Sequence, residues 1–374
     1  MESEGVKKVL VTGANGFIGK NLSARLAHEN VEVIRFTREI SLEKLKKEIS
    51  QVDFIFHLAG VNRPDDQREF YEGNVRLTER LIEIVKDSKR TLPILYTSSI
   101  RAVRDEPYGR SKRQAEELLR NYAEETGAEI YIYRLPNVFG KWCRPYYNNV
   151  IATFCHNLAR ELPIRIDDPG VELTLVYIDD VVREFLHAMK GEAHRTGEFC
   201  EVPVVYRAKL EAIAGIIASF KESRTQRTIP NLKDPFVKKL YSTYLSYLPE
   251  DRFSYELTMR TDHRGSFTEF LRTEDKGQVS VNITKPGKIK GNHWHHTKNE
   301  KFLVVSGKGV IRLRKIDSDE VIEYFVSEEK LEVVDIPPGY THHMENVGDK
   351  DLVTIMWANE PFDPDHPDTY DLEV

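Results

Sequence analysis

The sequence has little cysteine and no long hydrophobic run. Its 374 residues include 3 cysteines, Cys143, Cys155 and Cys200, and no two of them stand in a C-x-x-C spacing. An odd number without that spacing argues against a disulfide framework and against thiolate metal ligation. No stretch of about eighteen apolar residues appears, and only a short charged leader, not a signal peptide, precedes the first apolar run. We therefore expect a cytoplasmic protein without membrane insertion.

The chain also lacks an excess of positive charge. Lys and Arg number 54 against 60 Asp and Glu, which gives a formal net charge of -6. This balance argues against a nucleic-acid partner, although a local basic pocket for a phosphate is compatible with it. The length predicts two or three domains, at about 150 residues per domain.

Residues 8–134 alternate short apolar runs with helical patterns. Strands are expected at 9–11, 31–36, 54–58, 94–96 and 130–133. In the first helical pattern, Ile18, Leu22 and Leu26 recur every four residues, which is the spacing of one helix face. Alternating strands and helices predict a Rossmann-type, doubly wound parallel sheet with helices on both faces.

The helical patterns disappear after about residue 255. Strand-like runs follow at 278–284, 301–305, 310–314, 321–326, 331–336 and 352–357. Turns rich in Gly, Pro and Asp separate them, which predicts an antiparallel jelly-roll barrel. We place the boundary in the helical, tyrosine-rich passage before these strands, giving an α/β domain at 1–243 and an all-β domain at 244–374.

A glycine-rich turn links the first predicted strand to the first predicted helix. Glycine there lets the backbone approach a pyrophosphate, whose charge is favoured at the amino end of a helix. The alternative is a turn without a ligand, but the strand-turn-helix context favours a nucleotide. The expected cofactor-binding residues are Gly13, Asn15, Gly16, Phe17, Ile18 and Gly19 and, after the third strand, Leu58 and Ala59.

The second predicted strand ends without an acidic residue. Arg35 and Arg38 stand where an Asp or Glu would otherwise accept hydrogen bonds from the adenosine ribose. Arginines at this position suit a 2'-phosphate, which favours NADPH over NADH. The alternative is that both arginines are only solvated.

A tyrosine and a lysine stand four residues apart at the start of a predicted helix. Tyr108 and Lys112 follow Pro107, so both side chains share one helix face and the Lys112 ammonium is expected to lower the pKa of the Tyr108 phenol. Such a phenol can protonate a developing alkoxide while a cofactor delivers hydride. Ser99 is placed to hydrogen-bond the same carbonyl oxygen.

These motifs together resemble the extended short-chain dehydrogenase/reductase family. Its TGxxGxxG pattern falls on Gly13, Gly16 and Gly19, and Ser99, Tyr108 and Lys112 match its catalytic positions. The resemblance implies binding of NADP(H) and a nucleotide-sugar substrate, with Asn137 on the substrate side. The Asp-Glu pair of the family's 4,6-dehydratases is replaced by Ile100 and Arg101, which argues against dehydration.

The carboxy-terminal half contains a set of metal-ligand residues. His293 and His295 alternate along a strand and so share one face, while Glu300 and His342 could complete the set. Three imidazoles and one carboxylate suit a borderline divalent metal such as Zn, with Mn, Fe and Ni also compatible.

The spacing of these four residues resembles the two motifs of the cupins. The preceding segment, 262–269, resembles the opening of the dTDP-4-keto-sugar 3,5-epimerases, and this match makes Arg264 a candidate for a substrate phosphate; a plain surface arginine is the alternative. Cupin barrels commonly pair, so the resemblance implies a homodimer. A metal on a 4-keto oxygen would acidify the neighbouring C3 proton; the residues do not identify the base.

Nearly the whole chain resembles bifunctional capsular polysaccharide enzymes that join these two halves. The segments 142–143, 241–249 and 291–300 carry this resemblance. It implies C3 epimerisation of a UDP-2-acetamido-2,6-dideoxy-4-hexulose in the cupin and then NADPH-dependent C4 reduction to UDP-N-acetyl-6-deoxy-L-talosamine, a precursor of UDP-N-acetyl-L-fucosamine. The alternatives are a reductase or a 4-epimerase whose cupin only binds a sugar or holds a dimer together.

Overall fold

The computed structural model describes residues 7–37, 42–273 and 275–374, which form two compact units. The first unit holds the chain up to Ser219 together with Lys233–Pro249, and the second holds Phe220–Leu232 and Glu250–Val374. The boundary predicted after residue 243 falls inside helix α9 (Pro235–Leu245), whose Tyr244 is still buried. No helix in the described part of the chain is long and apolar enough to cross a membrane.

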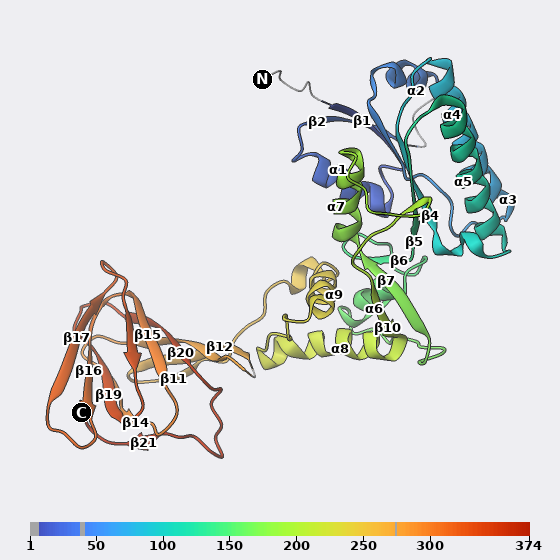
Figure 1. Cartoon of the computed structure of the whole chain (residues 1–374). Helices are drawn as coiled ribbons and strands as arrows, with labels where there is room; N and C mark the ends of the chain where they lie inside the picture. Colours follow the sequence, from blue (N-terminus) through green and yellow to red (C-terminus); the bar gives the residue numbers. More distant parts are fainter. Residues whose placement is uncertain (1–6, 38–41, 274) are drawn as a thin grey trace, which may run out of the picture. The chain divides into compact units, whose positions relative to one another are not determined.

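A seven-stranded sheet forms the centre of the first unit (Figure 1). Its strands, in spatial order, are β2 (Val31–Phe36), β1 (Lys7–Thr12), β3 (Phe54–His57), β4 (Ile94–Ser99), β5 (Ile130–Leu135), β9 (Phe199–Cys200) and β8 (Arg195–Thr196). All neighbours pair in parallel except β8 with β9. The order reverses at β1, which confirms the predicted doubly wound sheet.

Helices cover both faces of this sheet because apolar residues alternate toward two separate cores. One core joins the sheet to α1 (Phe17–Leu26) and α7 (Ile178–Met189). The other joins it to α2 (Leu42–Glu48), α4 (Leu77–Asp87) and α5 (Pro107–Thr126). Figure 1 shows these two groups on opposite sides of the strands.

A small second sheet completes the first unit and was not predicted from the sequence. It consists of β10 (Tyr206–Lys209), β7 (Glu172–Tyr177) and β6 (Asn137–Phe139). The helices α6 (Val150–Leu158) and α9 belong to the same unit, and α8 (Leu210–Gln226) begins in it and crosses into the second unit after Ser219. Short helical segments fill the connections: η1 (Ile49–Gln51), α3 (Arg68–Phe70), η2 (Tyr71–Arg76), η3 (Ile100–Val103) and η4 (Glu250–Arg252).

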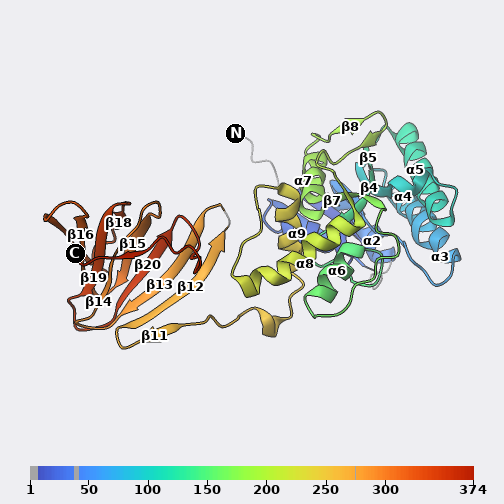
Figure 2. The same ribbon diagram turned by 90° about the horizontal axis from the view of Figure 1, so that it is seen from below.

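The second unit is built from two antiparallel sheets (Figure 2). One has the order β11 (Arg260–Asp262), β12 (Gly265–Thr273), β13 (Gly277–Thr284), β20 (Leu352–Ala358), β15 (Glu300–Ser306) and β18 (Val333–Ile336). The other has the order β17 (Val321–Ser327), β16 (Lys308–Lys315), β19 (Tyr340–Asn346), β14 (Ile289–Trp294) and β21 (Tyr370–Asp371). Phe302 and Val304 of one sheet pack with Ile311 and Met344 of the other in a shared core, which confirms the predicted all-β architecture.

Candidate functional site

The glycine turn after β1 is shaped for close approach of a ligand to the backbone. Gly13 has a positive φ of 69°, and a Cβ there would lie 2.7 Å from the Ala59 nitrogen. A Cβ at Gly19 would lie 2.2 Å from the Gly13 oxygen, so both positions require glycine. Gly16 is the N-cap of α1. Because it has no side chain to accept from the first N–H groups of the helix, these groups are left for an anion. The turn therefore fits a cofactor pyrophosphate.

The other predicted cofactor residues surround this turn to different degrees. Asn15 is exposed, while Phe17 and Ile18 are half-buried and pack on the core beneath the turn. Arg35 is exposed on β2. Arg38 lies outside the described residues.

A buried histidine that sequence reasoning missed fixes the loop after β3 against the turn. Thr78 donates its hydroxyl to a helix carbonyl, so the His57 Nε2–H donates to Thr78 at 2.9 Å and His57 Nδ1 accepts from Thr12 at 2.8 Å. The Thr12 oxygen in turn accepts from the backbone amides of residues 58–59, each at 3.1 Å. Burial, with a contribution from nearby Lys112, lowers the pKa of His57 to about 3, which keeps this imidazole neutral.

The three predicted catalytic residues lie at the carboxyl end of β4 and the start of α5. Ser99 ends β4, Tyr108 lies in the first turn of α5, and Lys112 follows one turn later. Lys112 is buried; its Nζ donates to the Thr97 carbonyl oxygen at 2.9 Å and lies 4.8 Å from the centre of the Tyr96 ring. The structure thus brings the predicted residues to one edge of the sheet.

The predicted effect of Lys112 on Tyr108 is corrected by the structure. Burial raises the pKa of Tyr108, and the opposing effects come from a hydrogen bond with Ser99 and from the charge of Arg101. Burial also lowers the pKa of Lys112 to about 8, against the attraction of Glu116. Desolvation outweighs the helix-face proximity used in the sequence argument, so Tyr108 stays protonated at neutral pH.

Two further buried polar residues support this edge and were missed. Asn74 accepts from the Val61 amide at 2.9 Å and donates to Ser111 on α5 at 2.9 Å, which ties the loop after β3 to the helix of Tyr108. Glu116 accepts two hydrogen bonds from Arg134, at 2.9 and 2.6 Å, behind the same helix. Their signal in the sequence is weak because isolated polar residues in helical patterns usually face solvent.

The predicted substrate-side residue lies on the small second sheet. Asn137 is exposed on β6, and its side-chain amide donates to the Thr174 carbonyl oxygen at 3.2 Å. Asn137 and the three predicted catalytic residues belong to the same unit.

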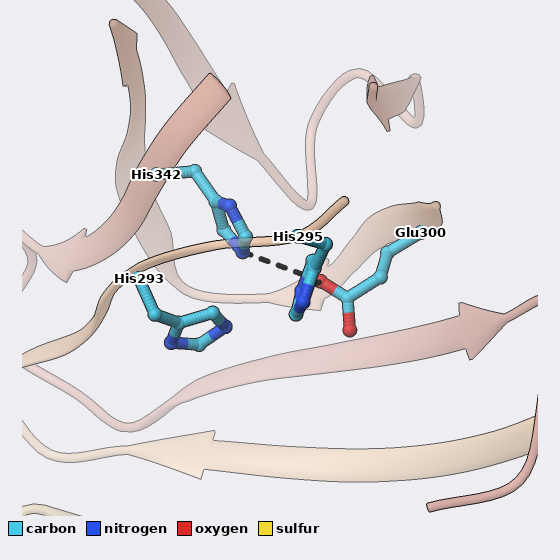
Figure 3. Close-up of side chains that lie close together, drawn as sticks. All are labelled: His293, His295, Glu300 and His342. Carbon is cyan, nitrogen blue, oxygen red and sulfur yellow. Dashed lines mark ion pairs between the residues drawn. The ribbon is translucent and has the colours of Figure 1, made fainter. Parts of the chain in front are cut away.

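In the second unit, the four predicted metal ligands converge (Figure 3). Their ligand atoms all lie within 4.8 Å of one another. Glu300 Oε2 lies 3.2 Å from His342 Nε2 and 3.6 Å from His295 Nε2, and the His293 ring centre lies 4.6 Å from that of His342. The residues come from β14, the turn after it, β15 and β19.

The polar atoms at the centre of this cluster fit a bound cation. His295 Nε2, Glu300 Oε2 and His342 Nε2 are buried and have no hydrogen-bond partner among the described residues. On its other edge, His295 Nδ1 donates to the Asp368 carbonyl oxygen at 2.5 Å, so its Nε2 lone pair faces the cluster. Three imidazoles and one carboxylate are the ligand set of a Zn²⁺-type site.

Electrostatics favour the protonation states that bind a metal. Burial, and then the neighbouring His342, lowers the pKa of His293 to about 4. Burial acts to raise the pKa of Glu300, but the imidazoles of His295 and His342 outweigh it and leave that pKa lowered. Near neutral pH, His293 is neutral and Glu300 is charged.

A cavity of about 930 Å³ in the second unit contains the cluster in its wall. Lys290, which the sequence analysis missed, lines the same cavity and donates to the Ser266 and Ile283 carbonyl oxygens and to Asn282 Oδ1, at 3.1, 2.9 and 3.0 Å. Arg264 also lines it, with Nε and Nη2 bonded to Asp262 at 3.1 and 2.7 Å. The cavity is large enough for a sugar nucleotide.

Comparison with known proteins supports both units. Residues 9–202 match the NAD dependent epimerase/dehydratase family, and residues 260–370 match the polysaccharide biosynthesis C-terminal domain. A UDP-2-acetamido-2,6-beta-L-arabino-hexul-4-ose reductase from Pseudomonas aeruginosa is 49% identical over 368 residues, which cover 98% of this chain and 99% of the relative.

Solved structures of similar proteins agree with the fold. The capsular polysaccharide assembling protein CapF from Staphylococcus aureus is 56% identical, with a TM-score of 0.93, over 98% of this chain and 100% of CapF. CapF with the inhibitor 3-isopropenyl-tropolone is 52% identical, with a TM-score of 0.88, over the same shares of 98% and 100%. The predicted resemblance to capsular polysaccharide enzymes is confirmed. The chain belongs to the NAD dependent epimerase/dehydratase family, whose description implies a nicotinamide cofactor in the first unit.

Proposed function

We propose that this chain is a bifunctional nucleotide-sugar enzyme. Its second unit epimerises C3 of a UDP-2-acetamido-2,6-dideoxy-4-hexulose, and its first unit then reduces C4 with NADPH, giving UDP-N-acetyl-6-deoxy-L-talosamine. The observation that carries the proposal is the presence of two different reaction centres on one chain: a glycine turn with Ser99, Tyr108 and Lys112, and a buried cluster of three histidines and Glu300.

The named activity of a relative supports the reduction step. The Pseudomonas aeruginosa relative is named a UDP-2-acetamido-2,6-beta-L-arabino-hexul-4-ose reductase, and this chain matches 99% of its length. A 4-keto group is also the activating group for epimerisation at C3, because it acidifies the neighbouring proton. The two reactions are therefore consecutive on one substrate.

In the first unit, Tyr108 at the start of α5 supplies the proton for reduction, next to Ser99 at the end of β4. A bound nicotinamide cofactor supplies the hydride. Tyr108, protonated at neutral pH, gives its phenolic proton to the developing C4 alkoxide, and Ser99 hydrogen-bonds the same oxygen. Lys112 adds positive charge at this edge, and Arg35 on β2 favours the 2'-phosphate of NADPH.

In the second unit, His293, His295, Glu300 and His342 would hold a divalent metal, with Zn as the best fit. Such a metal supplies a Lewis acid for a carbonyl oxygen. Lys290 donates to three acceptors and places its ammonium group in the cavity wall. CapF binds a tropolone inhibitor, and tropolones chelate metals through two adjacent oxygens, which supports the metal assignment.

Exposed apolar side chains support the homodimer expected from the cupin resemblance. Val321, Ile322, Tyr324 and Phe325 all lie on β17, an edge strand, and Phe325 is 70% exposed. An apolar edge strand of this kind is normally covered by a partner.

The proposed function is tested with the 4-keto product of UDP-GlcNAc dehydration and 5-epimerisation as substrate. We expect oxidation of NADPH and, in a parallel sample without NADPH, exchange of the C3 proton with deuterated water. The contradicting result is NADPH oxidation with other ketones but neither NADPH oxidation nor C3 exchange with this substrate. The second unit would then be a binding module and not an epimerase.

The proposed reduction should lose activity at alkaline pH. Lys112 is cationic below its pKa of about 8 and neutral above it, whereas Tyr108 stays protonated through this range, so kcat/KM should fall above about pH 8. In Lys112→Arg the charge persists, and the alkaline limb should move to higher pH. If the alkaline fall of kcat/KM occurs at the same pH in Lys112→Arg as in the wild type, a group other than Lys112 is responsible for it.

A further inference from the structure

We propose that Arg227 and Arg272 bind the diphosphate group of the nucleotide sugar in the cavity of the second unit. This inference rests on the proposed function. It places the 4-keto sugar at the metal cluster and the diphosphate at the two arginines of the same cavity. Six cationic side chains and three carboxylates line the cavity, so it favours an anion, and a nucleoside diphosphate is the anionic part of this substrate class.

Arg227 reaches the cavity from a segment outside both family matches, which cover residues 9–202 and 260–370. The Arg272 amide donates to the Arg227 carbonyl oxygen at 2.8 Å, and the Ile229 amide donates to the Arg272 carbonyl oxygen at 3.3 Å. These bonds hold the segment against β12, and Arg227 itself adopts a positive φ of 59°. This φ is that of a helix C-cap: α8 ends at Gln226, and the Thr228 amide donates to the Ser223 carbonyl oxygen at 2.7 Å, so the helix end fixes the backbone of Arg227 at the cavity wall.

One carboxylate holds the two arginines side by side. Glu269 accepts from Arg272 Nε and Nη2 at 2.7 and 2.8 Å, and its Oε1 lies 3.2 Å from Arg227 Nε. Arg227 Nε is nevertheless buried and forms no hydrogen bond with the part of the chain that the structure describes. Glu269 thus offsets the repulsion between the two guanidinium groups, whose remaining N–H donors suit the paired oxygens of a diphosphate.

Most other cations of the cavity are already committed. Arg264 is bonded to Asp262, Lys290 donates to three acceptors, and Lys298 donates to the Pro367 carbonyl oxygen at 2.7 Å. Arg260 lies 6.0 Å from the centre of the Phe362 ring. Arg227 and Arg272 differ from Arg264 because they share a single carboxylate, Glu269, so this corner of the cavity carries two guanidinium groups against one negative charge.

The distance between this arginine pair and the metal cluster suits the length of a hexose with its diphosphate. Arg272 pairs with Gln278, Gln278 with Ala358, and Ala358 with Glu300, so Arg272 and Glu300 occupy one row across four strands. Three strand spacings of about 4.8 Å separate their backbones by about 14 Å. Both side chains line the cavity, and a hexose with its diphosphate fits between them.

The test compares C3 proton exchange, measured by NMR without NADPH, in the metal-loaded wild-type protein and in Arg227→Met. We expect the KM for exchange to rise about tenfold to a hundredfold, because a charged hydrogen-bond partner is lost, while kcat and metal content stay nearly unchanged. Arg227→Lys should recover part of the affinity. An unchanged KM in Arg227→Met would overturn the proposal.

Arg312→Met is the matched control. Arg312 also lies between two carboxylates, Glu323 and Glu345, but it does not line the cavity, so this variant should keep the wild-type KM. Calorimetric titration with inorganic pyrophosphate, on NADPH-saturated protein, separates the two proposals. If the wild type shows no C3 exchange, the proposed epimerase function is wrong. The anion site is then still supported if Arg227→Met binds pyrophosphate more weakly than the wild type, and it is overturned if both bind pyrophosphate equally.

Discussion

In Tyr108→Phe, NADPH oxidation should fall about a hundredfold to ten-thousandfold, because the change removes the proton donor from the edge of the first sheet. Phenylalanine fills the same half-buried space beside Phe70, whose ring centre lies 5.7 Å from that of Tyr108, so the fold should persist. The measurement is the rate of NADPH loss with saturating 4-keto sugar.

The same variant tests whether the two reactions are separable. C3 proton exchange should continue at the wild-type rate in Tyr108→Phe, because all four residues of the histidine cluster belong to the other unit. Tyr122→Phe is a control in a buried tyrosine of the same helix: its hydroxyl bonds to the backbone of Leu92 and should not affect hydride transfer. Simultaneous loss of exchange and reduction in Tyr108→Phe would argue against two independent sites.

His293→Asn should abolish C3 proton exchange and leave NADPH oxidation intact, which is the reverse of the result expected for Tyr108→Phe. Loss of one of three imidazoles should release most of the bound metal at purification and reduce C3 exchange to background, because no other described side chain in the cluster replaces the ligand. Metal content is measured by elemental analysis, and exchange is measured by NMR. NADPH oxidation of the C3-epimerised sugar should remain.

A neighbouring histidine provides the control for this variant. His296 is exposed and packs on Trp294 and Tyr370, with ring centres 4.4 and 5.0 Å away, and it is not part of the cluster. His296→Asn should therefore keep the metal and the exchange reaction. If His293→Asn loses its metal but still exchanges the C3 proton, the metal is structural and the proposed epimerisation chemistry is wrong.

The features predicted best were those carried by short, local patterns. Gly13 and Gly19 of the turn occupy positions where any Cβ would collide with backbone, so their spacing reports a local geometry directly. Strand alternation likewise predicted that His293 and His295 share a face, whereas Glu300 and His342 were assigned from the spacing of the cupin motifs.

Features that depend on long-range packing could not be predicted. The sign of the pKa shift of Tyr108 is set by burial, which the spacing of Tyr108 and Lys112 does not report. Arg227 joins β12 through backbone bonds to a residue 45 positions away, and no local pattern marks that contact. Asp368 is similar: it supports His295 from the end of the chain.

The central claim, that one substrate passes through both sites in order, is tested most directly by running the complete reaction in deuterated water with NADPH. The account predicts that every molecule of reduced product carries deuterium at C3, because the proton there is removed and replaced before the 4-keto group is consumed. Stoichiometric NADPH oxidation that gives a product with its original C3 hydrogen would contradict the account and would leave the first unit as a reductase acting alone.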